Sequence, residues 1–108
     1  MSSPSALSCD ESFTEIFSVS SLDGSREPSL LSLPPNGEAK ALVVGLHTWS
    51  AERFTPQASL LPFCLERGWA LLLPEFRGPN LVTNPRAREA GGSALARRDI
   101  VDATRVVL

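Results

Sequence analysis

Few residues of this chain could act as nucleophiles, general bases or metal ligands. His47 is the only histidine among 108 residues, and the only cysteines are Cys9 and Cys64. Zinc sites and disulfide frameworks need clusters of these residue types, so we expect no metal and no disulfide framework. Ser93 stands in Gly91-Gly92-Ser93-Ala94-Leu95, which lacks the second glycine of a G-x-S-x-G nucleophile elbow. Ser93 therefore fits a helix cap better than a nucleophile.

Phosphate binding and nucleic-acid binding are both disfavoured. No G-x-G-x-x-G or G-x-x-x-x-G-K-S/T motif follows the apolar run 41–46, so a nucleotide-binding domain would lack its phosphate cradle. The 10 basic and 12 acidic residues give a net charge of -2, and the longest basic run is Arg97-Arg98. We therefore expect no cofactor and no nucleic-acid partner.

Arg77 and two aspartates form the charged constellation of most interest. Arg77 follows the apolar run 69–73, and a helix that starts near Ser93 should return beside it. An ion pair from Arg77 to Asp99 or Asp102 would tie the intervening loop to the sheet, which is a structural role. The alternative is that Arg77 binds a substrate carboxylate.

The elements that must position these residues begin with a hairpin. Residues 13–19 are rich in Phe, Ile and Val and predict a strand, and Leu22-Asp23-Gly24 predicts a turn. A second strand should continue to Leu33, with Pro28 limiting its start or marking an edge position.

Two uninterrupted apolar runs, 41–46 and 69–73, predict strands buried on both faces, which is typical of a parallel sheet. The segment between them is long enough for a helical crossover. Thr55 is the expected N-cap, and Gly68 the expected left-handed stop. Pro62 favours a late start of the helix, so that the proline falls in its first turn.

A last helix should begin after Ser93. Its apolar stripe consists of Ala96, Ile100, Ala103 and Val107. Its opposite face should expose the charged residues Arg98, Asp102 and Arg105. The order hairpin, strand, helix, strand, helix places the chain in the α/β class, with right-handed crossovers.

Four segments in this order resemble the α/β-hydrolase domain of prolyl-oligopeptidase-like (peptidase S9-like) serine hydrolases. They are the hairpin with its two turns, Leu46-His47-Thr48-Trp49-Ser50, the segment 73–80 and the segment 92–103. The resemblance covers about residues 13–108. It implies a partial α/β-hydrolase domain over 12–108 with an incomplete sheet, truncated before the nucleophile elbow. In that fold the strands lie in the order first, second, fourth, third, fifth. Residues 1–11 are rich in serine and show no apolar pattern, so we expect them to form a disordered tail.

The resemblance also implies one functional element, half of an oxyanion hole. The loop after the third strand would supply a backbone N–H, from Thr48 or Trp49, to the developing oxyanion of acyl transfer. His47 would orient this turn, in which Thr48 stands where glycine is commoner. The Ser-Asp-His triad of the family is absent from the chain.

The sequence therefore suggests a fragment of a serine hydrolase, either a peptidase or an esterase, that is inactive by itself. An intact homologue would act on a small-molecule or peptide acyl substrate. The alternative is a non-catalytic interaction fragment of the α/β class. The N-terminus lacks a secretory signal and no run is long enough to span a membrane, so we expect a cytoplasmic location. With no fifth strand, the run 41–46 would be an unprotected edge through which copies could associate.

Overall fold

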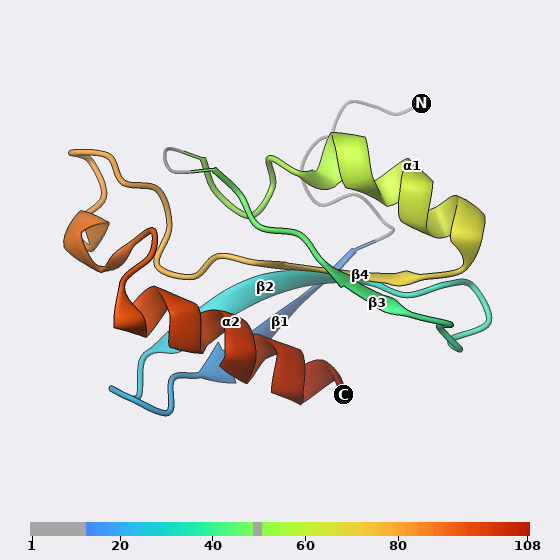
Figure 1. The fold of residues 1–108 in the computed structure, drawn as a ribbon, viewed down its shortest axis with the longest axis horizontal. Coiled ribbons are helices and arrows are strands. Elements are labelled where there is room, and N and C mark those ends of the chain that lie inside the picture. Colours follow the sequence, from blue (N-terminus) through green and yellow to red (C-terminus); the bar gives the residue numbers. More distant parts are fainter. Residues whose placement is uncertain (1–12, 49–50) are drawn as a thin grey trace.

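The computed structural model describes residues 13–48 and 51–108, so the tail expected over 1–11 and the candidate donor Trp49 lie outside the described residues. A four-stranded sheet has the order β1-β2-β4-β3, with α1 on one face and α2 on the other (Figure 1). The elements are β1 (Thr14–Val19), β2 (Arg26–Ser32), β3 (Leu42–Val44), α1 (Gln57–Arg67), β4 (Ala70–Pro74), the short 3-10 helix η2 (Ala87–Glu89) and α2 (Ala94–Val107). Both the element order and the strand order agree with the prediction.

The predicted hairpin is formed by β1 and β2, which pair in antiparallel fashion across the turn at residues 20–25. Gly24 has a φ of 77°, a left-handed conformation that glycine adopts without a Cβ clash. Pro28 lies inside β2 rather than limiting its start, and β2 is a central strand. The carbonyl of Pro28 accepts from Glu75 N, so its missing N–H faces β4 just beyond the β2–β4 ladder, which starts at Ser29. Pro28 therefore cannot donate to the opposed Glu75 O, and that carbonyl lies 2.7 Å from His47 Nε2 instead.

The two apolar runs form the parallel pair β3–β4. Every residue of β4 is buried, as expected for a central strand. In contrast, β3 is only three residues long and half-buried, because it has a hydrogen-bonded neighbour on one side only. The prediction of burial on both faces is therefore right for β4 and too strong for β3.

Helix α1 begins at Gln57 with Pro56 as its N-cap residue, one position later than the expected cap Thr55. The hydroxyl of Thr55 donates to Glu52 instead of capping the helix. Pro62 lies inside the helix, so the start is not delayed as predicted. The expected stop is present, since Gly68 ends the helix with a φ of 71°.

Helix α2 begins after Ser93, whose hydroxyl accepts from Ala96 N as a cap. The predicted stripe is partly right, because Ala96 and Ala103 are buried while Ile100 and Val107 are half-buried. The prediction that Asp102 is exposed is wrong. Asp99 and Asp102 both lie on the buried face, because positions three apart in a helix project to the same side.

The hydrophobic core lies between α1 and the sheet. Its buried members are Phe13, Leu30, Leu61, Cys64, Leu71 and Leu73. Gly45 allows α1 to approach β3 closely, since a Cβ there would lie 2.5 Å from Leu60 Cδ1 and 2.8 Å from Leu73 Cδ2. Over the described residues, no helix combines the length and the apolar character needed to cross a membrane.

Candidate functional site

A small pocket lies where the chain leaves β3 and β4. Its lining consists of Leu46, His47, Thr48, Phe76, Gly91 and Gly92, and its volume is about 250 Å³. The carboxyl ends of parallel strands meet at one edge of the sheet, which is where open α/β folds bind their ligands. The pocket therefore lies between three segments: the loop after β3, from which the sequence predicts an oxyanion donor, the turn after β4, and the residues just before α2.

His47 fixes the geometry of the loop. Its Nδ1 lies 2.8 Å from Thr48 O, and its Nε2 lies 2.7 Å from Glu75 O. The imidazole is also stacked on Phe76, with 4.2 Å between ring centroids. A neutral imidazole carries one N–H and can donate to only one of these oxygens at a time. Both ring nitrogens of His47 thus lie against backbone carbonyls, one at the end of each strand, and the ring lies between the end of β3 and the end of β4.

Thr48 is exposed beside this pocket. Its carbonyl accepts from Ala51 N at 3.1 Å, whereas within residues 13–48 and 51–108 its N–H donates no hydrogen bond. A free N–H on a loop held by a buried histidine is the kind of donor that an oxyanion hole uses. The other candidate donor, Trp49, is outside the described part of the chain.

Arg53 anchors the far side of the loop. Its backbone N and its Nη1 both donate to Glu75 Oε1, at 2.9 and 3.1 Å. Its Nη2 donates to Glu15 Oε2 on β1 at 2.8 Å. The loop that contains Thr48 is therefore tied at both sides to residue 75, the first residue after β4.

The turn after β4 is strained. Phe76 and Arg77 have φ values of 33° and 80°, and Gly78 follows with 79°. Left-handed conformations of residues other than glycine cost about 1–3 kcal/mol each and persist only where surrounding contacts impose them. Asn84 Nδ2 donates to the carbonyls of Arg77 and Pro79, at 3.0 and 2.6 Å, and supplies such contacts.

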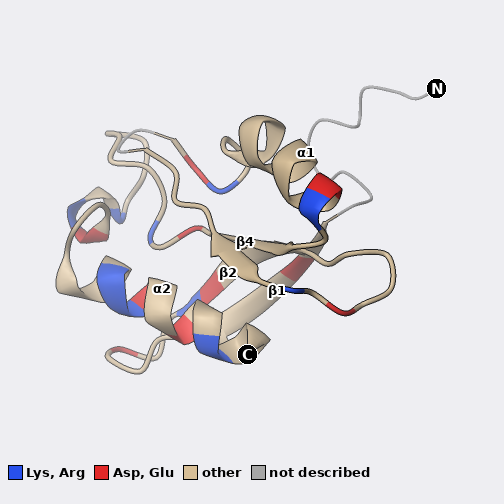
Figure 2. Cartoon of the chain, turned by 45° about the vertical axis from the view of Figure 1, so that its right-hand side comes forward, with Lys and Arg blue, Asp and Glu red and all other residues tan. Residues whose placement is uncertain are grey.

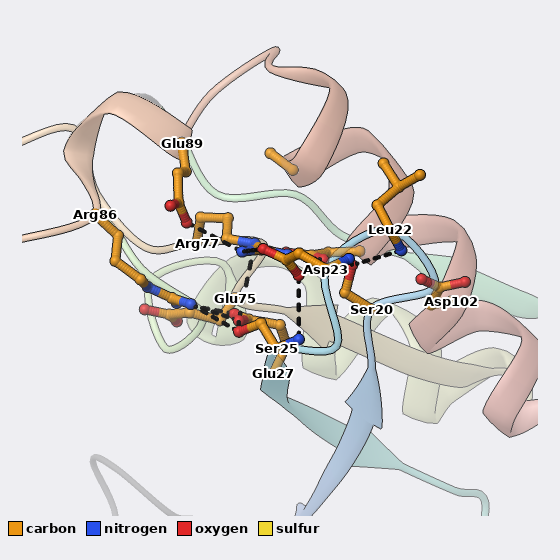
Figure 3. A network of polar contacts seen from close by, with 12 residues as sticks. Ser20, Leu22, Asp23, Ser25, Glu27, Glu75, Arg77, Arg86, Glu89 and Asp102 are labelled. Carbon is orange, nitrogen blue, oxygen red and sulfur yellow. Dashed lines mark hydrogen bonds and ion pairs between the residues drawn. The ribbon is translucent and has the colours of Figure 1, made fainter.

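This strained turn sends the buried Arg77 side chain into a cluster of carboxylates, of which Asp99 is buried and Asp23 and Glu89 are partly exposed (Figure 3). Asp99 accepts from Nε at 2.6 Å and from Nη2 at 3.0 Å. Asp23 accepts from Nη1 and Nη2 at 2.9 and 3.0 Å, and Glu89 accepts from Nη1 at 3.0 Å. A guanidinium has five N–H donors, and these five bonds occupy all of them. Arg77 therefore has no donor free for a substrate carboxylate.

The structure brings Arg77 and Asp99 together but gives Asp102 a different partner. One carboxylate oxygen of Asp102 accepts from the backbone N of Ser21 at 2.8 Å, and the Ser21 hydroxyl contacts both oxygens at 3.2 Å. Acidic and basic residues follow one another along α2 (Figure 2). Its two buried aspartates hold the hairpin, Asp99 through Arg77 and Asp102 directly.

A second ion pair, which sequence reasoning missed, lies beside this cluster. Arg86 donates to Glu27 Oε2 at 2.5 Å and to Oε1 at 2.9 Å, and the Ser25 hydroxyl donates to the same carboxylate. Glu27 is only 2% exposed and lies 3.8 Å from Arg77 Nε. No local signal links residues 27 and 86, because the pairing depends on where the 78–92 loop packs.

The cluster shifts the acidity of its members. The hydrogen bonds from Arg77 hold the pKa of Asp23 well below its usual range, and the bonds to Asp23 and Asp99 raise the pKa of Arg77. Burial raises the pKa of Asp99, although the bonds from Arg77 act against this. Burial also acts to raise the pKa of Glu27, but hydrogen bonds from Arg86 and Ser25 outweigh it, so that this pKa lies below its usual value.

No group of three or more His, Cys, Asp or Glu residues suited to holding a metal ion occurs within the described ranges. The Arg77 cluster is thus an internal clamp that fixes the strained turn and the hairpin. The pocket beside Thr48 is the place where chemistry could occur.

Comparison with solved structures identifies a protein of similar fold. A crystal structure of S-formylglutathione hydrolase (FrmB) from Staphylococcus aureus, in the apoenzyme form, matches with a TM-score of 0.57 and 16% sequence identity. The match covers 88% of this chain and 39% of that chain, so this chain spans well under half of its structural neighbour. Neither the protein-family models nor the curated proteins give a match to the sequence. The predicted fold class is confirmed in that the four-stranded α/β sheet matches part of a chain with the α/β-hydrolase fold.

Proposed function

We propose that this chain is the N-terminal part of a hydrolase of the α/β type, and that it contributes one backbone donor of an oxyanion hole. The donor is the N–H of Thr48. The observation that carries the proposal is the combination of that N–H, without an acceptor among the described residues, with a pocket of about 250 Å³ at the carboxyl ends of β3 and β4.

The physical argument for the role of Thr48 is preorganisation. An oxyanion donor is effective when its direction is fixed before the reaction, because no reorganisation then accompanies charge development. His47 is 8% exposed and bridges the two strand ends, and Arg53 holds the loop through Glu75. These contacts support a fixed orientation of the loop.

The reaction class that we propose is acyl transfer to water. The structural neighbour is named for hydrolysis of S-formylglutathione, which carries its acyl group on sulfur. The neighbour therefore favours an esterase-like over a peptidase-like reaction for this chain, and the prolyl-oligopeptidase resemblance stays a prediction. The small pocket suits a short acyl group on the substrate of the whole enzyme.

A tetrahedral anion without a leaving group tests the proposal directly. We expect methyl methylphosphonate, titrated into the ¹⁵N-labelled chain, to shift the amide resonance of Thr48 and those of Leu46 and Gly92 at the pocket. The reason is that an N–H proton moves downfield when it donates to an anionic oxygen.

Two variants sharpen the test. Thr48→Pro removes the N–H and should weaken binding, followed at Gly92, by about tenfold, the usual value of a hydrogen bond to a charged group. Thr48→Ala is the matched control, since it keeps the N–H and should bind like the parent. Equal binding by the proline variant, or shifts centred on the exposed arginines of α2, would contradict the proposal.

A further inference from the structure

Pro28 is a residue whose position the fold by itself does not explain. It lies inside β2, and β2 is hydrogen-bonded to β1 on one side and to β4 on the other (Figure 1). Proline is normally confined to edge strands, to strand starts and to bulges, because it has no N–H to donate to a ladder. A proline inside a central strand therefore calls for a reason other than strand formation.

The N–H that Pro28 lacks would point at one particular carbonyl. Ser29 lies opposite Pro74 in the β2–β4 register, so Pro28 lies opposite Glu75. Glu75 N donates to Pro28 O at 3.1 Å, which makes these two residues a hydrogen-bonded pair of an antiparallel ladder. In such a pair each residue donates to the other. Any other residue at position 28 would thus direct its N–H at Glu75 O.

The Glu75 carbonyl has two other nitrogen atoms close to it. Gly78 N donates to it at 2.9 Å within the strained turn, and His47 Nε2 lies 2.7 Å from it. A carbonyl oxygen has two lone pairs, so these two contacts use both. A further donor at position 28 would compete for the same oxygen. Because Gly78 belongs to the same tight turn as Glu75, the contact with His47 is the one that would weaken.

We infer that Pro28 is a positioning residue for the loop that carries Thr48. By withholding an N–H from Glu75 O, it leaves that carbonyl to His47, the neighbour of Thr48. Without this bond the imidazole would keep its stacking on Phe76, but a stacked ring can still turn in its own plane. The Thr48 N–H would then be less well oriented before an anion arrives. The inference rests on the proposed function, since it concerns the donor proposed there.

This role also assigns a hydrogen atom on the imidazole. Glu75 O can only accept, so Nε2 of His47 must carry the hydrogen. Thr48 O, which faces Nδ1, already accepts from Ala51 N at 3.1 Å. Because His47 is the only histidine in the chain, its ring ¹⁵N resonances identify themselves. We expect the parent chain to show a slowly exchanging Nε2–H, and a hydrogen on Nδ1 alone would overturn the inference without any variant.

Pro28→Ala supplies the missing N–H and tests the inference. We expect the Nε2–H of His47 to exchange faster, and the affinity for methyl methylphosphonate, followed at Gly92, to fall about fivefold, the usual value of one hydrogen bond. The urea midpoint should stay close to that of the parent, because the new ladder bond offsets the entropy that the unfolded chain gains without proline. A residue with only a structural role would not weaken anion binding while stability is kept.

The matched control is the α-hydroxy analogue of alanine at position 28, which has the alanine side chain but an ester oxygen in place of the N–H. It should bind the anion like the parent, since no new donor reaches Glu75 O. Parent-like binding by Pro28→Ala, or equal weakening by the control, would overturn the inference and leave the Thr48 donor in place. If the anion did not shift Thr48 in the parent chain, the proposed function would fail, and the role of Pro28 with it.

Discussion

At the scale of single residues, Arg77 determines how the turn after β4 is held. Its side chain is 1% exposed, and all five of its donors are used on three carboxylates from the hairpin, η2 and α2. A buried ion pair contributes little compared with an apolar pair of the same shape, but removing one partner leaves an uncompensated charge. The cluster should therefore be sensitive to the loss of its cation.

We expect Arg77→Ala to destabilise the chain by about 3–5 kcal/mol, because the Asp99 carboxylate would stay buried without a counter-charge. Arg88→Ala is the matched control, since Arg88 is exposed and should cost less than about 0.5 kcal/mol. Urea unfolding measures both. A double-mutant cycle with Asp99→Asn should show strong coupling, and equal costs for the two arginine variants would argue against the clamp.

The pair of Glu27 and Arg86 should make stability depend on acid pH. The pKa of Glu27 is lower in the folded chain than the value of about 4.3 typical of an unfolded chain. Its stabilising contribution is therefore fully present above that value and is lost as the pH falls through the lower, folded pKa. The pKa of Asp23 is lowered too, so this residue acts with the same sign.

We expect Glu27→Gln to flatten the dependence of the urea midpoint on pH below about 4.5, since the titrating group is gone. Glu66→Gln, which changes an exposed carboxylate on α1, serves as the control and should leave the slope intact. If the Glu27 variant kept the parent slope, the acid dependence would have to come from other carboxylates.

At the scale of elements, the contact of α1 with β3 depends on Gly45. A methyl group there would overlap terminal atoms of Leu60 and Leu73. Since these side chains can shift only within a packed core, we expect Gly45→Ala to cost about 1–3 kcal/mol. Adding Leu60→Ala makes room for the methyl group. The free energy of unfolding of the double variant should therefore be higher than the sum of the two separate losses predicts. Strictly additive losses would show that Leu60 does not restrict the side chain at position 45.

Helix α1 carries a proline in its interior, which is unfavourable for a helix. Pro62 is exposed and cannot donate to the carbonyl of Ala58, one turn earlier. We expect Pro62→Ala to stabilise the chain by about 1–2 kcal/mol. Alanine restores the helical hydrogen bond and has the higher helix propensity, and this gain exceeds the loss that arises because the unfolded chain becomes more flexible without proline. Thermal unfolding measures this as a higher Tm. A lower Tm would mean that the proline ring makes a favourable contact.

At the scale of the whole molecule, the chain corresponds to 39% of its structural neighbour and contains no G-x-S-x-G motif. The sequence therefore offers no nucleophile elbow to act together with the proposed oxyanion donor. We expect the purified chain neither to react with a fluorophosphonate probe nor to hydrolyse 4-nitrophenyl acetate above background. Mass spectrometry of the probe-treated chain checks this, with Ser93→Ala as the control. A covalent adduct at Ser93 would show that the helix cap is also a nucleophile.

The sequence by itself determined the kinds of elements and their order. Glycine stops such as Gly68, the Ser93 cap and the apolar run of β4 are local signals, and local signals survive whatever the rest of the chain does. The strand order was predicted through the family resemblance, and it was correct because the helical crossover between β3 and β4 leaves few ways to form the sheet.

Only the tertiary structure decided which residues meet. Asp99 and Asp102 lie three apart on one face of α2, so sequence spacing could not tell which of them reaches Arg77. The distant pair of Glu27 and Arg86 and the strained turn at Phe76 depend on how loops pack after the sheet has formed. Side-chain pairing between distant segments is set by packing, and packing is a property of the whole fold rather than of any local stretch of sequence.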